Sequence, residues 1–211
     1  MKHITFYFDF ISPFAWLAFE QLPVALKGIS YSVSYKPVLF GAILKHHGQL
    51  GPAEIAPKRD WTYRHVLWLA HSLGIQLQMP ASHPFNPLGL LRLAVACNAD
   101  GTPNRYVCET LLRHVWCGGA EASDAARLQT VTEHLSPKQV PNSDEVKAQL
   151  KANTDEAIAC GVFGVPTFEV DGKLFWGMDA LPMLRACLLD DAWFGAAWDS
   201  VASVAAGVKR R

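Results

Sequence analysis

The sequence predicts an α/β fold in which a βαβ unit and a ββα unit are separated by a long helical stretch. Residues 3–10 are aromatic and β-branched with near period-two alternation, and a second strand is expected at residues 31–36. From residue 37 to about residue 159 the apolar residues follow helical periods instead. The strand pattern returns at residues 167–176, where Asp171-Gly172 is a strong hairpin signal. This order is typical of a thioredoxin-like core with a large all-helical insertion.

The first strand is expected to run directly into a helix. Ser12 is a preferred N-cap residue and Pro13 is favoured at the first helical position. The helix is expected from Pro13 to about Gln21 or Leu26, and Pro23 is expected to kink or divide it.

Five further helices are predicted between the two units, and breaks at residues 48–57, 79–86 and 101–104 separate them. Gly74 is well placed to end the first of them, and a last helical region begins near Ala180. We therefore assign residues 1–40 and 160–211 to the core and residues 41–159 to the insertion. The five helices are expected at residues 60–73, 87–99, 105–116, 124–135 and 144–159.

Composition excludes several classes of protein. Half of the 211 residues are apolar, so a disordered chain is excluded. Nineteen basic residues balance nineteen acidic ones, and the only basic block is Lys209, Arg210 and Arg211, so no nucleic-acid partner is expected. The sequence shows no secretory signal and no apolar run long enough for a membrane span. We expect a cytoplasmic protein with small-molecule partners.

The five cysteines predict neither a disulfide framework nor a metal site. Their number is odd, they form no C-x-x-C pair, and none has a companion histidine at ligand spacing. Reduced thiols packed inside helices are expected for all of them: Cys97, Cys108, Cys117, Cys160 and Cys187.

Ser12 is the first candidate functional residue because it lies where a strand ends and a helix begins. An anionic sulfur is favoured at a helix N-terminus, where backbone amides are free. Lowering a thiol pKa from about 8.5 to about 6.5 requires roughly 2.7 kcal/mol. The helix end supplies about 0.3 to 2 kcal/mol and a charged hydrogen bond roughly 1.5 to 3 kcal/mol. Ser12 either donates such a bond or simply caps the helix; no base is fixed beside it, so it is not expected to be a nucleophile.

Two more segments are candidates for the same site. Val165-Pro166 opens a strand, which is compatible with an ordinary trans proline or with a cis bond that leaves the Val165 backbone free to pair with an extended ligand. Asp179 follows the hairpin. Its carboxylate either caps the last helix or binds a ligand ammonium, and the two roles are compatible.

Residues 9–14, 164–167 and 175–179, together with residues 36–45, 56–59 and 83–88 and Arg92, resemble the 2-hydroxychromene-2-carboxylate isomerases and the kappa-class glutathione transferases. The resemblance covers nearly the whole chain and implies a fold similar to the DsbA-type oxidoreductases. Those proteins carry a C-x-x-C motif where this chain has Ser12-Pro13-Phe14-Ala15, so disulfide exchange by its own sulfur at that position is excluded.

The resemblance implies a role for each matching residue. Ser12 holds the thiolate of reduced glutathione, and Val165 with cis-Pro166 pairs with its cysteinyl backbone. Asp179 and the Met178 amide hold the γ-glutamyl end. Three other positions belong to the same expected glutathione site: Lys58 for the glycyl carboxylate, Trp176 as a wall, and Gln49.

An aromatic carbonyl acid is the substrate that the resemblance implies, and an apolar pocket is expected to receive it. Its carboxylate is expected to meet Lys36 or Arg92. The other expected pocket residues are Phe14, Phe40, Trp61, Trp68, Phe85 and Asn86, and for the aromatic ones plain core packing is the alternative.

Two departures from the family pattern concern the residues expected to bind glutathione. Gln49 stands where the transferases often have asparagine, and Ala180 stands where they often have arginine. The expected activity is isomerisation of the 2-hydroxychromene-2-carboxylate type, by reversible addition of the glutathione thiolate, in a homodimer. A glutathione transferase that releases a stable conjugate and a non-catalytic glutathione-binding module are the alternatives.

Overall fold

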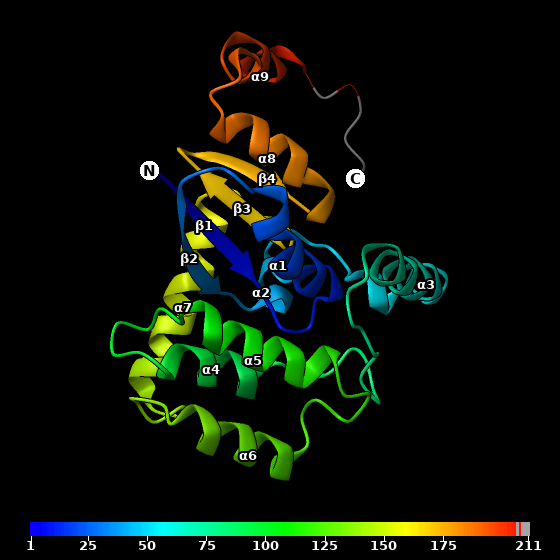
Figure 1. Cartoon of the computed structure of the whole chain (residues 1–211), viewed down its shortest axis with the longest axis vertical. Helices are drawn as coiled ribbons and strands as arrows, with labels where there is room; N and C mark the ends of the chain where they lie inside the picture. The colour runs from blue at the N-terminus through cyan, green and yellow to red at the C-terminus, as the bar shows by residue number, and fades with distance from the viewer. Residues whose placement is uncertain (206, 208–211) are drawn as a thin grey trace.

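A four-stranded mixed sheet forms the centre of the molecule (Figure 1). The computed structural model describes residues 1–205 and 207, so the basic residues Lys209, Arg210 and Arg211 lie outside the described part. The strand order is β2-β1-β3-β4, with β1 parallel to β2 and antiparallel to β3, and β3 antiparallel to β4. The strands are β1 (Lys2–Phe8), β2 (Tyr31–Pro37), β3 (Thr167–Val170) and β4 (Lys173–Trp176).

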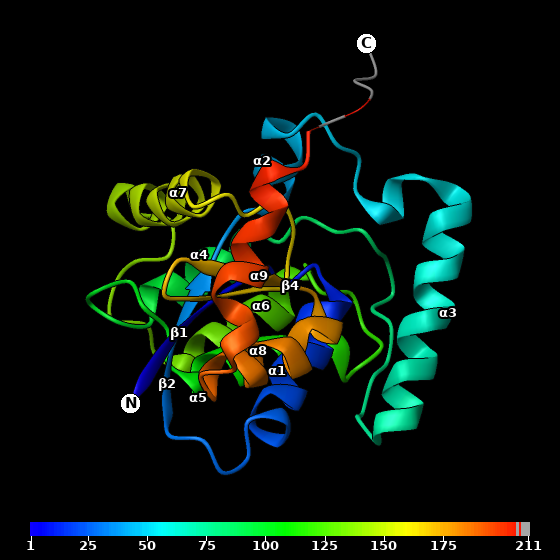
Figure 2. The same cartoon turned by 90° about the horizontal axis from the view of Figure 1, so that it is seen from above.

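The helices lie on both sides of this sheet (Figures 1 and 2). Helices α1 (Pro13–Ala25) and α8 (Leu181–Leu188) pack against each other, and α4 (Leu88–Ala96) and α7 (Asp144–Ala159) contact β2. The remaining helices are α2 (Phe40–His46), α3 (Ala56–Leu73), α5 (Arg105–Trp116), α6 (Ala125–Leu135) and α9 (Ala196–Asp199). Short 3₁₀ turns occur at Pro52–Glu54, Met178–Ala180, Ala192–Phe194 and Ser200–Ser203.

Pro23 lies inside α1, close to its C-terminal end, and the helix continues past it to Ala25, so Pro23 does not divide the helix. A proline inside a helix leaves the carbonyl four residues earlier without its usual donor. Here that carbonyl belongs to Phe19, and the guanidinium of Arg105 donates to it at 3.5 Å. A side chain of the helical insertion therefore satisfies the group that Pro23 releases.

The other elements follow the sequence with a few differences. Strand β1 ends at Phe8 instead of residue 10, and α4 ends at Ala96 instead of residue 99. Helix α2 was not expected, and α3 begins at Ala56 instead of residue 60 because Pro57 occupies its first turn, where a missing N–H costs nothing. Gly74 ends α3 in a left-handed conformation, as expected, with φ of 65°. The hairpin turn is also confirmed, because Asp171 and Gly172 both have positive φ.

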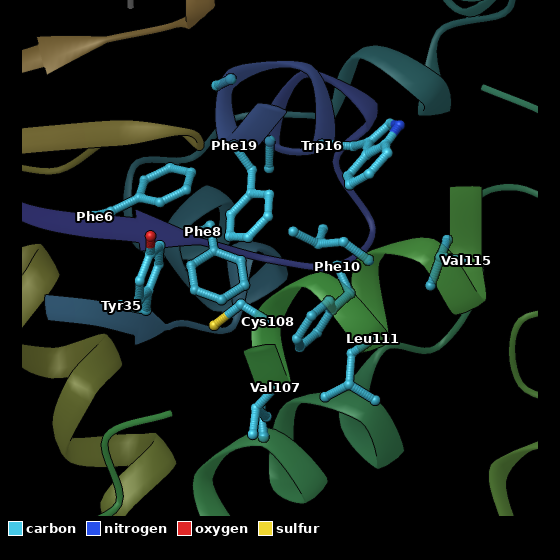
Figure 3. Packing of buried hydrophobic residues seen from close by; sticks show 14 of the residues in the cluster. Phe6, Phe8, Phe10, Trp16, Phe19, Tyr35, Val107, Cys108, Leu111 and Val115 are labelled. Carbon is cyan, nitrogen blue, oxygen red and sulfur yellow. The ribbon is translucent and has the colours of Figure 1, made fainter. Parts of the chain in front are cut away.

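One hydrophobic cluster joins the sheet to the inserted helices (Figure 3). Phe6 of β1 stacks on Phe168 of β3 with ring centroids 4.6 Å apart. Phe8 and Phe10 continue this row toward Val107, Leu111 and Val115 of α5, and all are buried. Because both parts of the chain share this cluster, the end of β1 is fixed from both sides.

Helix α3 stands apart from the body of the molecule in both views (Figures 1 and 2). Trp61 and Trp68 on this helix are 65% and 62% exposed. It contacts the body through its buried residues Val66 and Ala70, and at α1 His65 packs edge-on against Phe14 with ring centroids 6.0 Å apart. No helix among the described residues is long and apolar enough to cross a membrane.

The cysteines are free, but the expectation that all of them lie packed inside helices was wrong for Cys160. This residue is the C-cap of α7 and is exposed. Cys97 and Cys117 also occupy C-cap positions, while Cys108 is fully buried within α5. No group of three histidine, cysteine or acidic side chains that could hold a metal occurs in residues 1–205 and 207.

Candidate functional site

Ser12 caps α1 and faces the loop before β3. Its Oγ accepts a hydrogen bond from the Ala15 amide at 3.2 Å and donates to the Val165 carbonyl at 3.4 Å. The second bond is long, so little is lost when the hydroxyl turns to another acceptor. The amide of Phe14 has no hydrogen-bond acceptor in the described part of the chain. A hydroxyl and a free helix amide therefore lie side by side, as binding of an anion requires.

The loop at Val165-Pro166 lies directly against this helix end. The peptide bond between the two residues is cis, so the cis alternative is confirmed. Within residues 1–205 and 207 the amide of Val165 donates to no protein acceptor. An extended ligand can therefore pair with the backbone of Val165 beside the Ser12 hydroxyl.

The end of β4 meets the same loop. The Gly177 amide donates to the Pro166 carbonyl at 2.9 Å, which places Trp176 and the 178–180 turn next to the proline. The indole of Trp176 covers Gly164 so closely that a Cβ at Gly164 would lie 2.6 Å from its Nε1. Glycine is therefore required at position 164 for Trp176 to take this place.

The carboxylate of Asp179 is free to bind a ligand. A Cβ on Gly177, whose φ is +94°, would clash with the Asp179 carboxylate. Ala180 is the N-cap of α8 and no side chain caps that helix, so Asp179 does not have the capping role. Among the described residues no hydrogen bond or ion pair reaches this exposed carboxylate. Of the two expected roles of Asp179, only the binding of a ligand ammonium is compatible with these surroundings.

The turn that carries Ser12 is anchored by a buried acid, Asp9. Its two carboxylate oxygens accept hydrogen bonds from the Ile11 amide at 3.1 Å and the Phe40 amide at 2.9 Å. Complete burial raises the pKa of Asp9 to about 7, although these backbone hydrogen bonds act in the opposite direction. Asp9 therefore ties the turn before α1 to the start of α2.

Two side chains of the insertion hold the carbonyls of the same turn. The buried Trp116 donates from Nε1 to the Phe10 carbonyl at 3.1 Å, and His83 donates from Nε2 to the Ile11 carbonyl at 2.8 Å. Because a carbonyl only accepts, Nε2 of His83 carries the proton, and Tyr63 Oη lies 2.7 Å from its Nδ1. Burial lowers the pKa of His83, so the neutral ring is favoured.

We expect His83→Leu to lower the free energy of unfolding by about 1–3 kcal/mol, because the Ile11 carbonyl loses its donor. His83→Gln keeps an N–H at a similar reach and is expected to recover about half of this loss. Urea unfolding of both variants measures the difference. His114 offers a matched control, since its ring also meets a backbone carbonyl, that of Ala122 at 3.0 Å, but away from the turn. Equal losses in the Leu and Gln variants of His83 would contradict the assigned hydrogen bond.

The expected substrate pocket is only partly assembled around Ser12. Phe14 is half-buried next to it, and His65 joins it to Trp61, whose ring stacks on His65 at 5.9 Å. Phe85 is buried against His83, and Asn86 uses its Oδ1 to accept the Leu88 amide at 3.0 Å. The exposed Trp68 takes no part in this group.

The two cations expected for the substrate carboxylate have other surroundings. Lys36 is held by both oxygens of Glu156, at 2.7 and 2.8 Å, so its ammonium already has an anionic partner. Arg92 lines a separate hollow between α2, α4 and α7 that includes neither Ser12 nor Val165. Lys58 and Gln49 are both exposed, on α3 and in the loop after α2.

Sequence reasoning assigned no role to Asp9, Tyr63, His65, His83 or Trp116. Asp9 and His83 do lie within the segments that carry the family resemblance. The contacts that define their roles join residues between 20 and 106 positions apart, and no spacing pattern in the sequence predicts such contacts.

The chain is similar to known proteins in sequence and in fold. Residues 3–188 match the model of the DSBA-like thioredoxin domain. A 2-hydroxychromene-2-carboxylate isomerase from Sphingobium xenophagum is 28% identical over 197 residues, covering 90% of this chain and 99% of that protein. Glutathione S-transferase kappa 2 from Caenorhabditis elegans is 27% identical, covering 90% of this chain and 92% of the relative.

A solved structure of a 2-hydroxychromene-2-carboxylate isomerase superposes with a TM-score of 0.71 at 22% identity, covering 93% of this chain and 98% of the other. At this identity the likeness shows the fold. The family match spans most of the chain and agrees with the βαβ and ββα units on either side of the inserted helices. This chain therefore belongs to the DSBA-like thioredoxin domain family.

Proposed function

We propose that the protein is a glutathione-dependent isomerase that acts on an aromatic unsaturated keto acid of the 2-hydroxychromene-2-carboxylate type. The observation that carries the proposal is the convergence of the Ser12 hydroxyl, the cis-Pro166 loop and the free Asp179 carboxylate at one end of the sheet. Curated relatives named as isomerases and as kappa transferases, each matching about nine-tenths of the chain, support it.

The residues present fit glutathione. Ser12 and the Phe14 amide offer donors to a thiolate, the Val165 amide is free for a peptide backbone, and the Asp179 carboxylate is free for an ammonium. These groups match the thiol, peptide and γ-glutamyl parts of the tripeptide. In the proposal Met178 contributes its amide, Trp176 walls the site, and the exposed Gln49 and Lys58 lie toward the glycyl end.

When bound, glutathione supplies a sulfur nucleophile that adds to a conjugated carbon of the substrate and leaves again, so it is not consumed. Ser12 keeps the sulfur anionic by donating its hydroxyl hydrogen bond, while the start of α1 adds its favourable dipole. Phe14, Phe40 and Phe85 form the aromatic wall for the substrate in this proposal. The enzyme is proposed to act as a cytoplasmic homodimer.

A kappa-type transferase is the second candidate, because relatives of both names match with nearly the same identity and coverage. It uses the same thiolate site and differs in releasing a stable conjugate. An electrophile that is consumed together with glutathione identifies the transferase, whereas turnover at constant glutathione concentration identifies the isomerase.

Calorimetric titration with reduced glutathione at neutral pH is the first test. Binding in about the millimolar range or tighter is expected, followed by isomerisation of aromatic unsaturated keto acids when glutathione is present. No heat of binding at several temperatures would contradict the proposal. Reduction of insulin disulfides by the protein would contradict it as well, because Ser12 and Ala15 replace both cysteines of the redox motif.

Asp179→Ala is expected to weaken glutathione binding about tenfold without moving the pKa of the bound thiol. An exposed carboxylate contributes at the lower end of the range for a charged hydrogen bond, and its partner is the ammonium, far from the sulfur. Calorimetry measures the affinity for glutathione, and the ultraviolet absorbance of the thiolate measures the pKa of the bound thiol. Asp199→Ala, which removes an exposed carboxylate of α9, is the control. A large change in the thiol pKa of Asp179→Ala would contradict the prediction, because it would mean that this carboxylate lies near the sulfur and not at the γ-glutamyl end.

A further inference from the structure

A hollow of about 240 Å³ lies between the start of α2, the first turns of α4 and the face of α7 that carries Leu150 and Thr154. Its walls are mainly apolar and include Leu39, Leu88 and Ile158. Its position explains why Arg92 is not found beside Ser12. The volume is slightly below the usual range for drug-sized ligands and suits a smaller molecule.

Arg92 is the unusual member of this lining. Its Nη1 donates to the Asn142 side chain at 3.2 Å. Its Nε is buried and has no hydrogen-bond partner among the described residues. Nη2 also has no hydrogen-bond partner among the described residues and, unlike Nε, is not enclosed by protein atoms, so it is the nitrogen that a ligand can reach. A guanidinium N–H without a protein acceptor favours an anionic ligand, so Nη2 is free to pair with a carboxylate.

The charges around the hollow agree with this reading. Lys147 and Lys151 line it together with Arg92, and Asp155 is the acidic side chain of the lining. Both lysines also pair within α7, Lys147 with Asp144 at 3.0 Å and Lys151 with Asp155. The lining has three cations against one carboxylate, so its charge favours an anion.

We propose that this hollow binds a small organic acid whose carboxylate pairs with Arg92 and whose apolar body packs on Leu39, Leu88 and Ile158. An inorganic anion would leave the apolar walls wet, and an uncharged ring would leave the charge of Arg92 without an anionic partner. The inference does not require that the protein uses glutathione. The ligand is either the acid on which the enzyme acts or a separate effector acid.

The hollow borders the structure that anchors the candidate active site. Leu39 lines it, and the next residue, Phe40, donates its amide to Asp9 under the Ser12 turn. The Leu39 amide itself is held by Thr154 of α7 at 3.0 Å. A ligand packed on Leu39 is therefore expected to stabilise the segment that Asp9 binds.

Titration with cinnamate, followed by calorimetry or by shifts of backbone amide resonances, tests the proposal. Cinnamate is expected to bind at least about tenfold more tightly than cinnamamide, which has the same ring without the charge. Arg92→Gln is expected to lower cinnamate affinity about tenfold or more, because the charge that pairs with the carboxylate is lost. Equal binding of acid and amide would overturn the proposal.

Arg64→Gln is the matched control because Arg64 is an exposed arginine of α3, which does not line the hollow. It is expected to bind cinnamate like the unmodified protein. Ala42→Phe, which fills the hollow from α2, provides a second variant and is expected to reduce cinnamate binding while leaving glutathione binding unchanged. Undiminished cinnamate binding in both Arg92→Gln and Ala42→Phe would also overturn the proposal.

A competition experiment distinguishes a hollow that binds the substrate acid from one that binds a separate effector acid. Competition between cinnamate and a turned-over keto acid identifies the hollow as part of the substrate site. Independent binding of both identifies an effector site. Because the cinnamate titrations need no glutathione, failure of the proposed activity leaves the test of the hollow intact.

Discussion

Ser12→Ala is expected to raise the pKa of a glutathione thiol bound at the site by about one to two units. The variant removes a hydrogen bond from the hydroxyl to the charged sulfur, which contributes roughly 1.5–3 kcal/mol, and each pKa unit corresponds to about 1.4 kcal/mol. The dipole of α1 and the Phe14 amide remain, so part of the stabilisation is retained. Ultraviolet absorbance of the thiolate, titrated against pH, measures the shift.

Helix capping has to be separated from this effect, because Ser12 also accepts the Ala15 amide. Loss of a serine cap alone costs about 1 kcal/mol of stability. Ser143 caps α7 in the same way, through the Val146 amide at 3.3 Å, and lies outside the candidate site. Ser143→Ala is therefore expected to lose similar stability with no change in the thiol pKa. An unchanged thiol pKa in Ser12→Ala would remove the role assigned to Ser12.

The elements of the fold were predictable where local signals were strong. Alternation, the Asp171-Gly172 turn and the cap at Ser12 each act within a few residues, and helices α5 and α7 with strands β3 and β4 occur at the expected residues. The route of α1 through Pro23 was not predictable, because it depends on Arg105, a residue far along the chain that reaches the Phe19 carbonyl.

Some residues of the candidate site were likewise predictable from local signals, and others were not. Ser12, Pro166 and Asp179 could be selected because each has a local backbone signature at the end of an element. Lys36 and Arg92 were selected as cations within the segments that carry the family resemblance, and neither ground predicts which side chains lie next to them. Glu156 lies 120 positions from Lys36, and only the packing of α7 on β2 brings the two side chains together.

Asp9 gives the second large expected effect, a stability difference that depends on pH. The pKa of Asp9 is raised from 3.8 to about 7 in the folded protein. Between about pH 4 and pH 7 the folded protein therefore retains a proton that the unfolded chain has released. The stabilisation from this proton is complete below the unfolded pKa and is lost as the pH rises through the folded pKa, at up to about 1.4 kcal/mol per unit.

Asp9→Asn is isosteric but does not titrate, so it isolates this contribution from the other groups. The advantage of the unmodified protein over Asp9→Asn is expected to shrink by about 2–3 kcal/mol between roughly pH 5 and pH 8, measured by urea unfolding at each pH. A constant difference would show that Asp9 is already ionised near pH 5. The neutral form also suits the proposed chemistry, because an ionised carboxylate below the Ser12 turn would oppose a thiolate at the same helix end.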